Sequence, residues 1–210
     1  VEETLCFDAP LVQLAPADFV LELFHGPTLA FKDFGARFMA RLMAWLTRDE
    51  DRELTVLVAT SGDTGGAVAS AFHQVPGTRV IILFPKGKVS PLQEKQLTTL
   101  GHNITALEID GSFDDCQRLV KSAFLDAGLS QRLNLTSANS INLSRLVPQS
   151  FYYFHSSRMM PEGVDPAFVV PSGNFGNLTA GLLAQRLGLR VKHWIAATNR
   201  NDVVPAYLRS

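Results

Sequence analysis

The stretch TVLVATSGDTGGAVASAF, residues 55–72, decides the fold class. Its first part, Thr55 to Ala59, is a β-branched apolar run of the kind that forms a buried strand. A glycine-rich turn follows, and an alanine-rich segment beginning near Ala67 is expected to be helical. A strand that leads through a short turn into a helix is typical of βαβ units, so this stretch predicts a parallel sheet covered by helices.

The same alternation of apolar runs and amphipathic segments extends over the rest of the chain. Residues 33–47 carry apolar side chains at four-residue spacing, which places them on one face of a helix. We therefore predict an α/β protein with open, mostly parallel sheets and flanking helices. Further strands are expected at residues 79–84, 104–109, 167–170 and 192–196.

Several helix starts are marked by capping residues. Ser90 followed by Pro91 is typical of an N-cap with proline in the first turn, and Gly101 closes that segment. Ser112 precedes two acidic residues, which favours a helix start because carboxylates stabilise the positive end of a helix. Further helices are expected at residues 143–157 and 178–187.

The composition is that of a globular protein without a nucleic-acid or membrane partner. The 210 residues are 46% apolar and carry a formal net charge of -1. No basic stripe is present to neutralise nucleic-acid phosphates, and no apolar run approaches the roughly 20 residues that span a bilayer. Cys6 and Cys116 lie far apart without a CxxC or histidine spacing, so neither a disulfide nor a metal site is predicted.

We therefore expect a soluble, cytoplasmic protein, a monomer or homodimer that binds a small molecule. The chain starts at Val1 without a methionine and stops at Ser210, directly after a segment that begins like a helix. We expect it to be a fragment of a longer protein.

Two glycine-rich loops stand where a strand is expected to lead into a helix. In an open parallel sheet such turns line the crevice at the carboxyl ends of the strands, where ligands bind. Residues 60–66, TSGDTGG, and residues 171–177, PSGNFGN, each offer main-chain N–H groups at a helix start, an arrangement that binds anions. The second loop lacks the P-loop lysine and the GxGxxG spacing, so a compact phosphate fits it better than ATP or NAD.

A third segment, residues 25–34 (HGPTLAFKDF), places Lys32 among apolar neighbours at a helix entrance. Burial there lowers the pKa of a lysine and makes the neutral, nucleophilic amine available, as Schiff-base chemistry requires. By residue type alone, a surface lysine with its charge in water is the simpler interpretation.

These segments, in this order, resemble the pyridoxal-phosphate (PLP) dependent threonine synthases of bacteria and fungi. Residues 22–33 are similar to the segment that carries the PLP lysine, and residues 59–65 to the substrate loop. Residues 90–95, 138–145 and 171–176 are similar to three further segments of the family. The resemblance implies PLP fold type II, the tryptophan synthase β-like fold, with an incomplete large lobe.

The resemblance also implies roles for individual residues. Lys32 would form the Schiff base with PLP and act as the catalytic proton shuttle. The cofactor phosphate would be bound by Gly173, Asn174, Phe175, Gly176 and Asn177. The substrate carboxylate would be bound by Ser61, Gly62, Asp63 and Thr64, and the substrate phosphate by Lys88, Asn139 and Arg145.

The same resemblance implies how the chain is divided into lobes. Residues 1–33 would be the N-terminal segment of the large lobe that carries the PLP lysine, and residues 34–150 a small α/β lobe. Residues 151–210 would start the large C-terminal lobe with its phosphate loop.

The implied reaction converts O-phospho-L-homoserine and water into L-threonine and phosphate, a step of threonine biosynthesis. Two alternatives stay open. Another lyase of the same fold, such as a threonine or serine dehydratase, binds no phosphorylated amino acid and so would not depend on Lys88, Asn139 or Arg145. An inactive module that binds PLP or a phosphorylated metabolite needs no buried amine, and cofactor absorbance would distinguish it from an enzyme.

Overall fold

The computed structural model describes residues 3–139 and 142–209, which divide into two compact units. The first unit comprises Val1–Pro10 and Glu22–Arg145, and the second comprises Leu11–Leu21 and Leu146–Ser210. Lys32 and the first glycine loop belong to the first unit, whereas the second glycine loop belongs to the second. The lobe boundaries implied by the resemblance, after residues 33 and 150, stay a prediction.

The first unit is built on a four-stranded parallel sheet in the order β5-β4-β3-β6. Three strands, β3 (Leu54–Ala59), β4 (Thr78–Pro85) and β5 (Ile104–Ile109), lie within one residue of the predicted bounds. The fourth, β6 (Asn134–Ser137), was not predicted, because its sequence NLTS has no apolar run. It is a strand because it pairs in parallel with β3.

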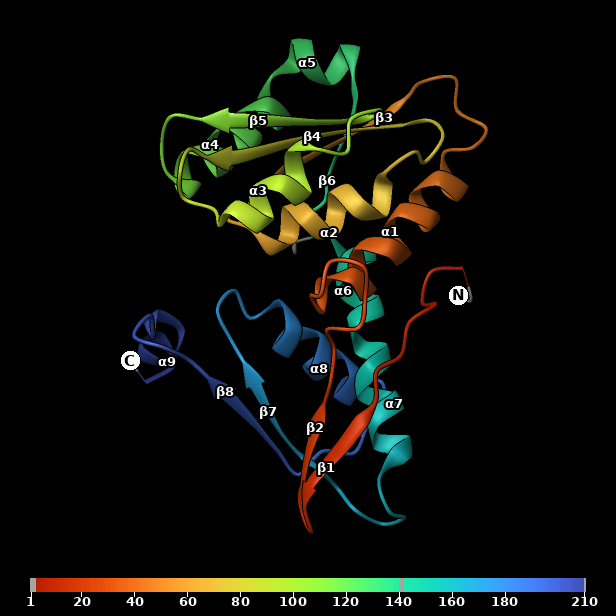
Figure 1. Cartoon of the computed structure of the whole chain (residues 1–210), viewed down its shortest axis with the longest axis vertical. Helices are drawn as coiled ribbons and strands as arrows, with labels where there is room; N and C mark the ends of the chain where they lie inside the picture. Colours follow the sequence, from red (N-terminus) through yellow and green to blue (C-terminus); the bar gives the residue numbers. More distant parts are fainter. Residues whose placement is uncertain (1–2, 140–141, 210) are drawn as a thin grey trace. The chain divides into compact units, whose positions relative to one another are not determined.

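Helices cover both faces of this sheet (Figure 1). α1 (Lys32–Leu46), α2 (Asp63–Phe72) and α3 (Pro91–Thr98) lie on one face. α4 (Phe113–Leu125) and α5 (Ala127–Arg132) lie on the other. The predicted α/β architecture with a parallel sheet and flanking helices is therefore confirmed.

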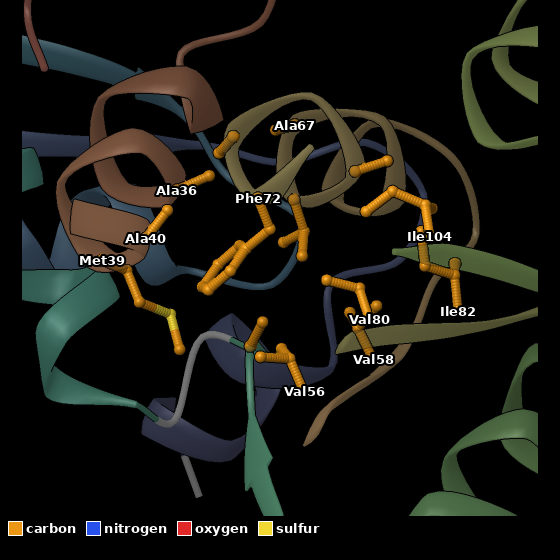
Figure 2. Close-up of a cluster of buried hydrophobic side chains, with 14 of the residues drawn as sticks. Ala36, Met39, Ala40, Val56, Val58, Ala67, Phe72, Val80, Ile82 and Ile104 are labelled. Atoms are coloured by element: carbon orange, nitrogen blue, oxygen red, sulfur yellow. The ribbon is translucent and has the colours of Figure 1, made fainter. Parts of the chain in front are cut away.

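The core of the first unit follows from the alternation of side chains along the strands. Val56 and Val58 of β3 point to one face and pack with Phe72 of α2 in a cluster whose members are buried (Figure 2). Leu57 points to the opposite face and packs with Cys116 of α4. Both faces of the sheet are thus buried, as is usual for parallel sheets. The polar loops therefore lie at the edge of the sheet, where the strands end.

The two helix starts predicted from capping serines, at Ser90 and Ser112, are confirmed. The Ser90 hydroxyl accepts the Gln93 N–H, and the Gln93 side chain accepts the Ser90 N–H in return. Ser112 and Asp115 form the same reciprocal cap at α4. Gly101 follows α3 in the left-handed conformation, with φ of +64°, which glycine adopts without steric cost.

The second unit holds two small sheets. β1 (Leu11–Ala15) and β2 (Asp18–Leu21) form an antiparallel hairpin that was not predicted. β7 (Ala167–Pro171) and β8 (His193–Ala197) pair in parallel, and α8 (Gly176–Arg186) lies between them in the chain. These last three elements lie within two residues of the predicted bounds.

The segment predicted as one helix, residues 143–157, is divided in the structure. α6 (Leu143–Leu146) is followed by a 3-10 turn, η1 (Val147–Ser150), and then by α7 (Phe151–Met159). Pro148 lies in the turn, and proline lacks the N–H that a continuous α-helix needs. The prediction of an uninterrupted helix was therefore wrong.

A last helix, α9 (Val203–Arg209), follows β8, where the sequence predicted a helix start. Among residues 3–139 and 142–209, no helix is both long and apolar enough to cross a bilayer. The same part of the chain holds no group of three His, Cys, Asp or Glu side chains placed to bind a metal ion.

Candidate active site

Lys32 is the first residue of α1, at the helix entrance that the sequence predicted. Its side chain is 17% exposed, so the amine is largely removed from water. Burial lowers the pKa of Lys32, the carboxylate of Asp63 opposes this, and the guanidinium of Arg145 lowers the pKa further. The pKa therefore lies below the ordinary value of a lysine, which confirms the predicted shift and favours the nucleophilic amine.

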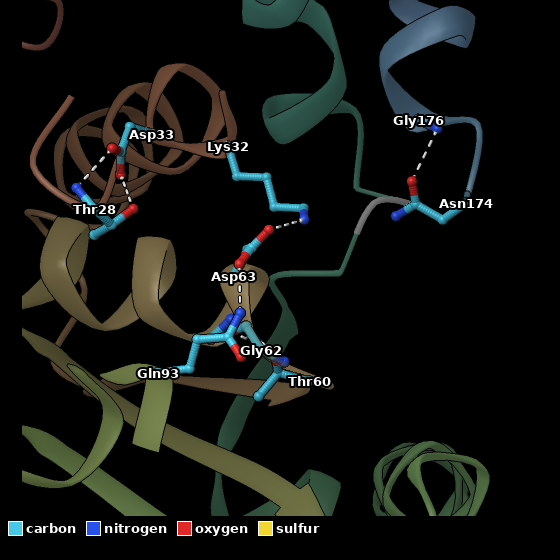
Figure 3. A network of polar contacts seen from close by, with 10 residues as sticks. Thr28, Lys32, Asp33, Thr60, Gly62, Asp63, Gln93, Asn174 and Gly176 are labelled. Atoms are coloured by element: carbon cyan, nitrogen blue, oxygen red, sulfur yellow. Dashed lines mark hydrogen bonds and ion pairs between the residues drawn. The ribbon is translucent and has the colours of Figure 1, made fainter. Parts of the chain in front are cut away.

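Asp63 is the acidic partner of this amine. Its Oδ2 lies 3.4 Å from Lys32 Nζ, and its Oδ1 accepts a hydrogen bond of 2.6 Å from Gln93 Nε2 (Figure 3). The Asp63 side chain is 50% exposed, so water screens part of its attraction to the ammonium group. A single carboxylate thus connects the lysine on α1 to the first turn of α3.

Asp63 is also the first residue of α2, so the helix begins four residues before the predicted start near Ala67. The Thr60 hydroxyl explains the early start, because it accepts the N–H groups of Gly62 (3.0 Å) and Gly65 (2.8 Å). Gly62 has φ of +151°, a conformation that L residues rarely adopt. The Thr60 hydroxyl therefore holds the predicted glycine turn at the start of α2, and the sequence analysis gave Thr60 no role.

The loop that leads into Lys32 is fixed by a buried carboxylate. Asp33 is fully buried and accepts hydrogen bonds from the N–H (2.8 Å) and the hydroxyl (2.7 Å) of Thr28 (Figure 3). A Cβ added to Gly26 would overlap the Asp33 carboxylate, so the chain there needs glycine. Burial raises the pKa of Asp33, although the hydrogen bonds from Thr28 act in the opposite direction.

Arg145 is the most buried of the residues expected to bind the substrate phosphate. It is 1% exposed, and its Nη1 donates a hydrogen bond of 2.5 Å to the Ala138 carbonyl. Burial lowers the pKa of Arg145 to about 10, so the guanidinium still carries its charge at neutral pH. A buried guanidinium is a strong donor for a phosphate group.

The other two candidate phosphate ligands have different surroundings. The side-chain amide of Asn139 forms two hydrogen bonds with the main chain of Ala59. Its Oδ1 accepts the Ala59 N–H at 3.3 Å, and its Nδ2 donates to the Ala59 carbonyl at 2.9 Å. Lys88 is exposed in the turn between β4 and α3. Ser140 and Ile141, which belong to the resembling segment 138–145, lie outside the described residues.

The second glycine loop connects β7 to α8 in the second unit. Phe175 is left-handed, with φ of 60°, and Asn174 Oδ1 accepts the Gly176 N–H at 3.3 Å (Figure 3). A Cβ added to Gly173 would meet no atom of residues 3–139 and 142–209 within 4 Å, so these residues leave the main chain open to a ligand there. Main-chain N–H groups at the start of an 11-residue helix provide the donors and the positive dipole end that a phosphate needs.

Two tyrosines of α7 hold the end of this loop. The hydroxyls of Tyr152 and Tyr153 donate to Asn177 Oδ1 at 2.6 Å and 2.5 Å, and the Tyr153 hydroxyl also contacts the Asn177 carbonyl at 3.1 Å. Burial raises the pKa of each tyrosine, so both hydroxyls remain protonated donors. The sequence analysis gave these tyrosines no role.

Each of the two sites, taken separately, fits one end of PLP. An aldehyde is attacked by a neutral amine, and Lys32 has a lowered pKa. A phosphate monoester is bound by main-chain N–H groups, which the loop before α8 supplies. The sequence analysis gave no role to Gln93 or Thr28, although Gln93 stands three residues after Ser90, the spacing of a capping box.

Comparison with known proteins finds relatives over the whole chain. Residues 6–209 match the family described as "Pyridoxal-phosphate dependent enzyme". Threonine synthase of Haemophilus influenzae is 55% identical over 212 residues, an alignment that covers 100% of this chain and 49% of the relative.

Solved structures of threonine synthases also match this chain. The crystal structure of threonine synthase from Escherichia coli matches with a TM-score of 0.91 and 55% identity, covering 100% of this chain and 49% of that one. The PLP-bound threonine synthase from Brucella melitensis matches with a TM-score of 0.86 and 47% identity, covering 96% and 44%. The resemblance predicted from the sequence and the type II fold are confirmed, and the chain spans about half the length of the curated relatives it matches.

Proposed function

Because this chain belongs to the family of pyridoxal-phosphate dependent enzymes, we propose that it carries active-site segments of a threonine synthase. The reaction would convert O-phospho-L-homoserine and water into L-threonine and inorganic phosphate. The observation that carries this proposal is the similarity to threonine synthases along the whole chain, which includes the segment with the buried amine of Lys32.

Lys32 is the proposed catalytic residue. Bound PLP supplies an electron sink for the substrate. The Lys32 amine would bind the cofactor aldehyde covalently and, once released, move protons at Cα and Cβ of the substrate. Its lowered pKa supports this role, and Asp63, at 3.4 Å, is placed to stabilise the protonated form.

The remaining proposed roles concern binding. Ser61, Gly62, Asp63 and Thr64 would bind the α-carboxylate at the start of α2, where N–H groups and the helix dipole favour an anion. Arg145, with Asn139 and Lys88, would hold the phosphate that leaves from Cγ before water adds at Cβ. The residues from Gly173 to Asn177 would hold the cofactor phosphate.

The proposal is tested with the full-length protein by following phosphate release and threonine formation from O-phospho-L-homoserine. Lys32→Ala should abolish both products and also the pyridoxyl label that borohydride leaves on the wild-type lysine. An inactive binding module would release no phosphate although it binds PLP.

Arg145→Lys distinguishes threonine synthase from the dehydratase alternative. The substitution keeps the charge but removes the guanidinium fork, so KM for phosphohomoserine should rise by about tenfold or more. The exposed Arg132→Lys is the matched control and should leave KM unchanged. An unchanged KM in Arg145→Lys would contradict the proposed phosphate site and favour a lyase that acts on an unphosphorylated amino acid.

We also propose that the protein acts in the cytoplasm, as a monomer or homodimer. The proposed substrate carries several charges and does not cross a bilayer unaided, which supports a reaction in the compartment where it is made. Light scattering of the full-length protein during size-exclusion chromatography measures the oligomeric state.

A further inference from the structure

Gln93 has a side chain whose orientation is fixed at one end. It stands at the third position of α3. Its side-chain Oε1 accepts the Ser90 main-chain N–H at 3.2 Å, and its main-chain N–H donates to the Ser90 hydroxyl at 3.3 Å. Because the carbonyl oxygen of the amide is used in this cap, the NH2 group points away from Ser90.

The NH2 group of Gln93 contacts the acidic partner of the lysine. Gln93 Nε2 donates to Asp63 Oδ1 at 2.6 Å, while the other carboxylate oxygen lies 3.4 Å from Lys32 Nζ (Figure 3). Gly62 makes room for this contact, because a Cβ there would overlap the Gln93 amide. The first turn of α3 is therefore in direct hydrogen-bond contact with the carboxylate that faces the lysine.

We propose that Gln93 is a positioning residue for Lys32, which acts by fixing the Asp63 carboxylate against the amine. Its importance for catalysis rests on the proposed function of Lys32, whereas the contact itself does not.

The need for such a residue follows from the exposure of Asp63. A side chain that is 50% exposed has room to rotate into water, and its attraction to the ammonium group falls when it does. A donor fixed by a helix cap holds one oxygen and thereby aims the other at Lys32. The positive charge of Arg145 also acts on Lys32 and favours the neutral amine, so the position of Asp63 decides how far this effect is offset.

The inference is tested by measuring the reactivity of the Lys32 amine in the full-length protein without PLP. The probe is acetic anhydride at low concentration, and peptide mass spectrometry gives the labelling rate of Lys32 as a function of pH. Gln93→Met removes the donor to Asp63 at similar size. It should raise the labelling rate at a fixed pH by about two- to fivefold, the range for a partly exposed charge pair. Asp63→Asn should act in the same direction and more strongly.

Gln93→Glu separates positioning from capping. Glutamate at this position keeps the reciprocal cap with Ser90, so α3 retains its start. It replaces the donor by a second carboxylate near the amine, which stabilises the ammonium form, so Lys32 should label more slowly than in the wild type. If Gln93 only capped α3, Gln93→Glu would label like the wild type because it keeps the cap, whereas positioning makes Gln93→Met label faster and Gln93→Glu label more slowly than the wild type.

Two results would overturn the inference. One is a pH profile of Lys32 in Gln93→Met that superimposes on the wild type while Asp63→Asn is shifted, since Gln93 would then only cap α3. The other is an unshifted profile in Gln93→Glu, since the side chain at this position would then not act on the amine through Asp63. Because the labelling needs no cofactor, a wild-type protein that fails to bind PLP would refute the proposed function and leave this result standing.

Discussion

Replacement of Asp33 tests whether its carboxylate fixes the loop that carries Lys32. Asp33→Ala removes the acceptor of two hydrogen bonds from Thr28, at 2.8 Å and 2.7 Å, from a fully buried position. Hydrogen bonds to charged groups contribute about 1.5–3 kcal/mol each. Thr28 is only half-buried, so water partly satisfies the freed donors and the lower value applies. We expect Asp33→Ala to lower the free energy of unfolding by about 3 kcal/mol, and Asp33→Asn by about 1 kcal/mol because the amide keeps one acceptor.

Urea unfolding of the full-length protein measures these values, and a double-mutant cycle isolates the side-chain contact. Thr28→Val removes the hydroxyl and keeps the shape of the side chain. The coupling energy between Thr28→Val and Asp33→Ala should be about 1–1.5 kcal/mol. Additive effects, with a coupling energy below about 0.5 kcal/mol, would refute the view that this hydrogen bond holds the loop.

The pH dependence gives a second test of the same carboxylate. Burial raises the pKa of Asp33 above its ordinary value of 3.8, so the folded protein keeps this proton to higher pH than the unfolded chain does. The associated stability is present below the unfolded pKa and is lost as the pH rises through the folded pKa. Asp33→Asn lacks this loss. The stability of the wild type relative to Asp33→Asn should therefore fall as the pH rises from below 3.8 towards neutrality, and a rising difference would contradict the sign of the shift.

Two further substitutions probe the core and the second glycine loop. Phe72→Ala, at a fully buried position of α2, should lower the free energy of unfolding by about 3–5 kcal/mol in urea, whereas Phe124→Ala, at 36% exposure, should cost clearly less. Tyr153→Phe removes the hydroxyl that contacts Asn177 and keeps the ring against Trp194, so a PLP titration should show an affinity loss of about five- to tenfold; an unchanged affinity would mean that the loop does not need this anchor.

The elements that the sequence predicted well are those whose signal is local. β3, β4 and β5 are rich in apolar and β-branched residues, and the caps at Ser90 and Ser112 use residues within one turn. β6 has no such signal, since its four residues form a strand only because they pair with β3 from a distant part of the chain. The start of α2 was misplaced for a related reason. Glycines disfavour helices on average, and here the Thr60 hydroxyl compensates by taking up two N–H groups of the turn.

In the site, too, the features encoded within a few residues were predicted, whereas contacts between distant parts of the chain were not. The motif around Lys32 identified the amine and its helix entrance, because both are encoded within a few residues. The partners that shape the site come from elsewhere in the chain, as Gln93 does for Asp63 and as Ala59 does for Asn139. Such contacts depend on the packing of α3 and β6 against their neighbours, which no single stretch of sequence encodes.

The reactivity of Lys32 depends on this packing as much as on the residue type. A group that both removes and returns a proton needs a pKa near the working pH, and burial lowers the pKa of Lys32 from its ordinary value. Asp63 counteracts burial and Arg145 reinforces it, so the two act on the amine with opposite sign. Loss of Asp63 should therefore increase the fraction of Lys32 in the neutral, nucleophilic form and lower its basicity, and loss of Arg145 should do the reverse. The sequence motif locates the amine, but the balance between its two charged neighbours determines which protonation state it offers to a substrate.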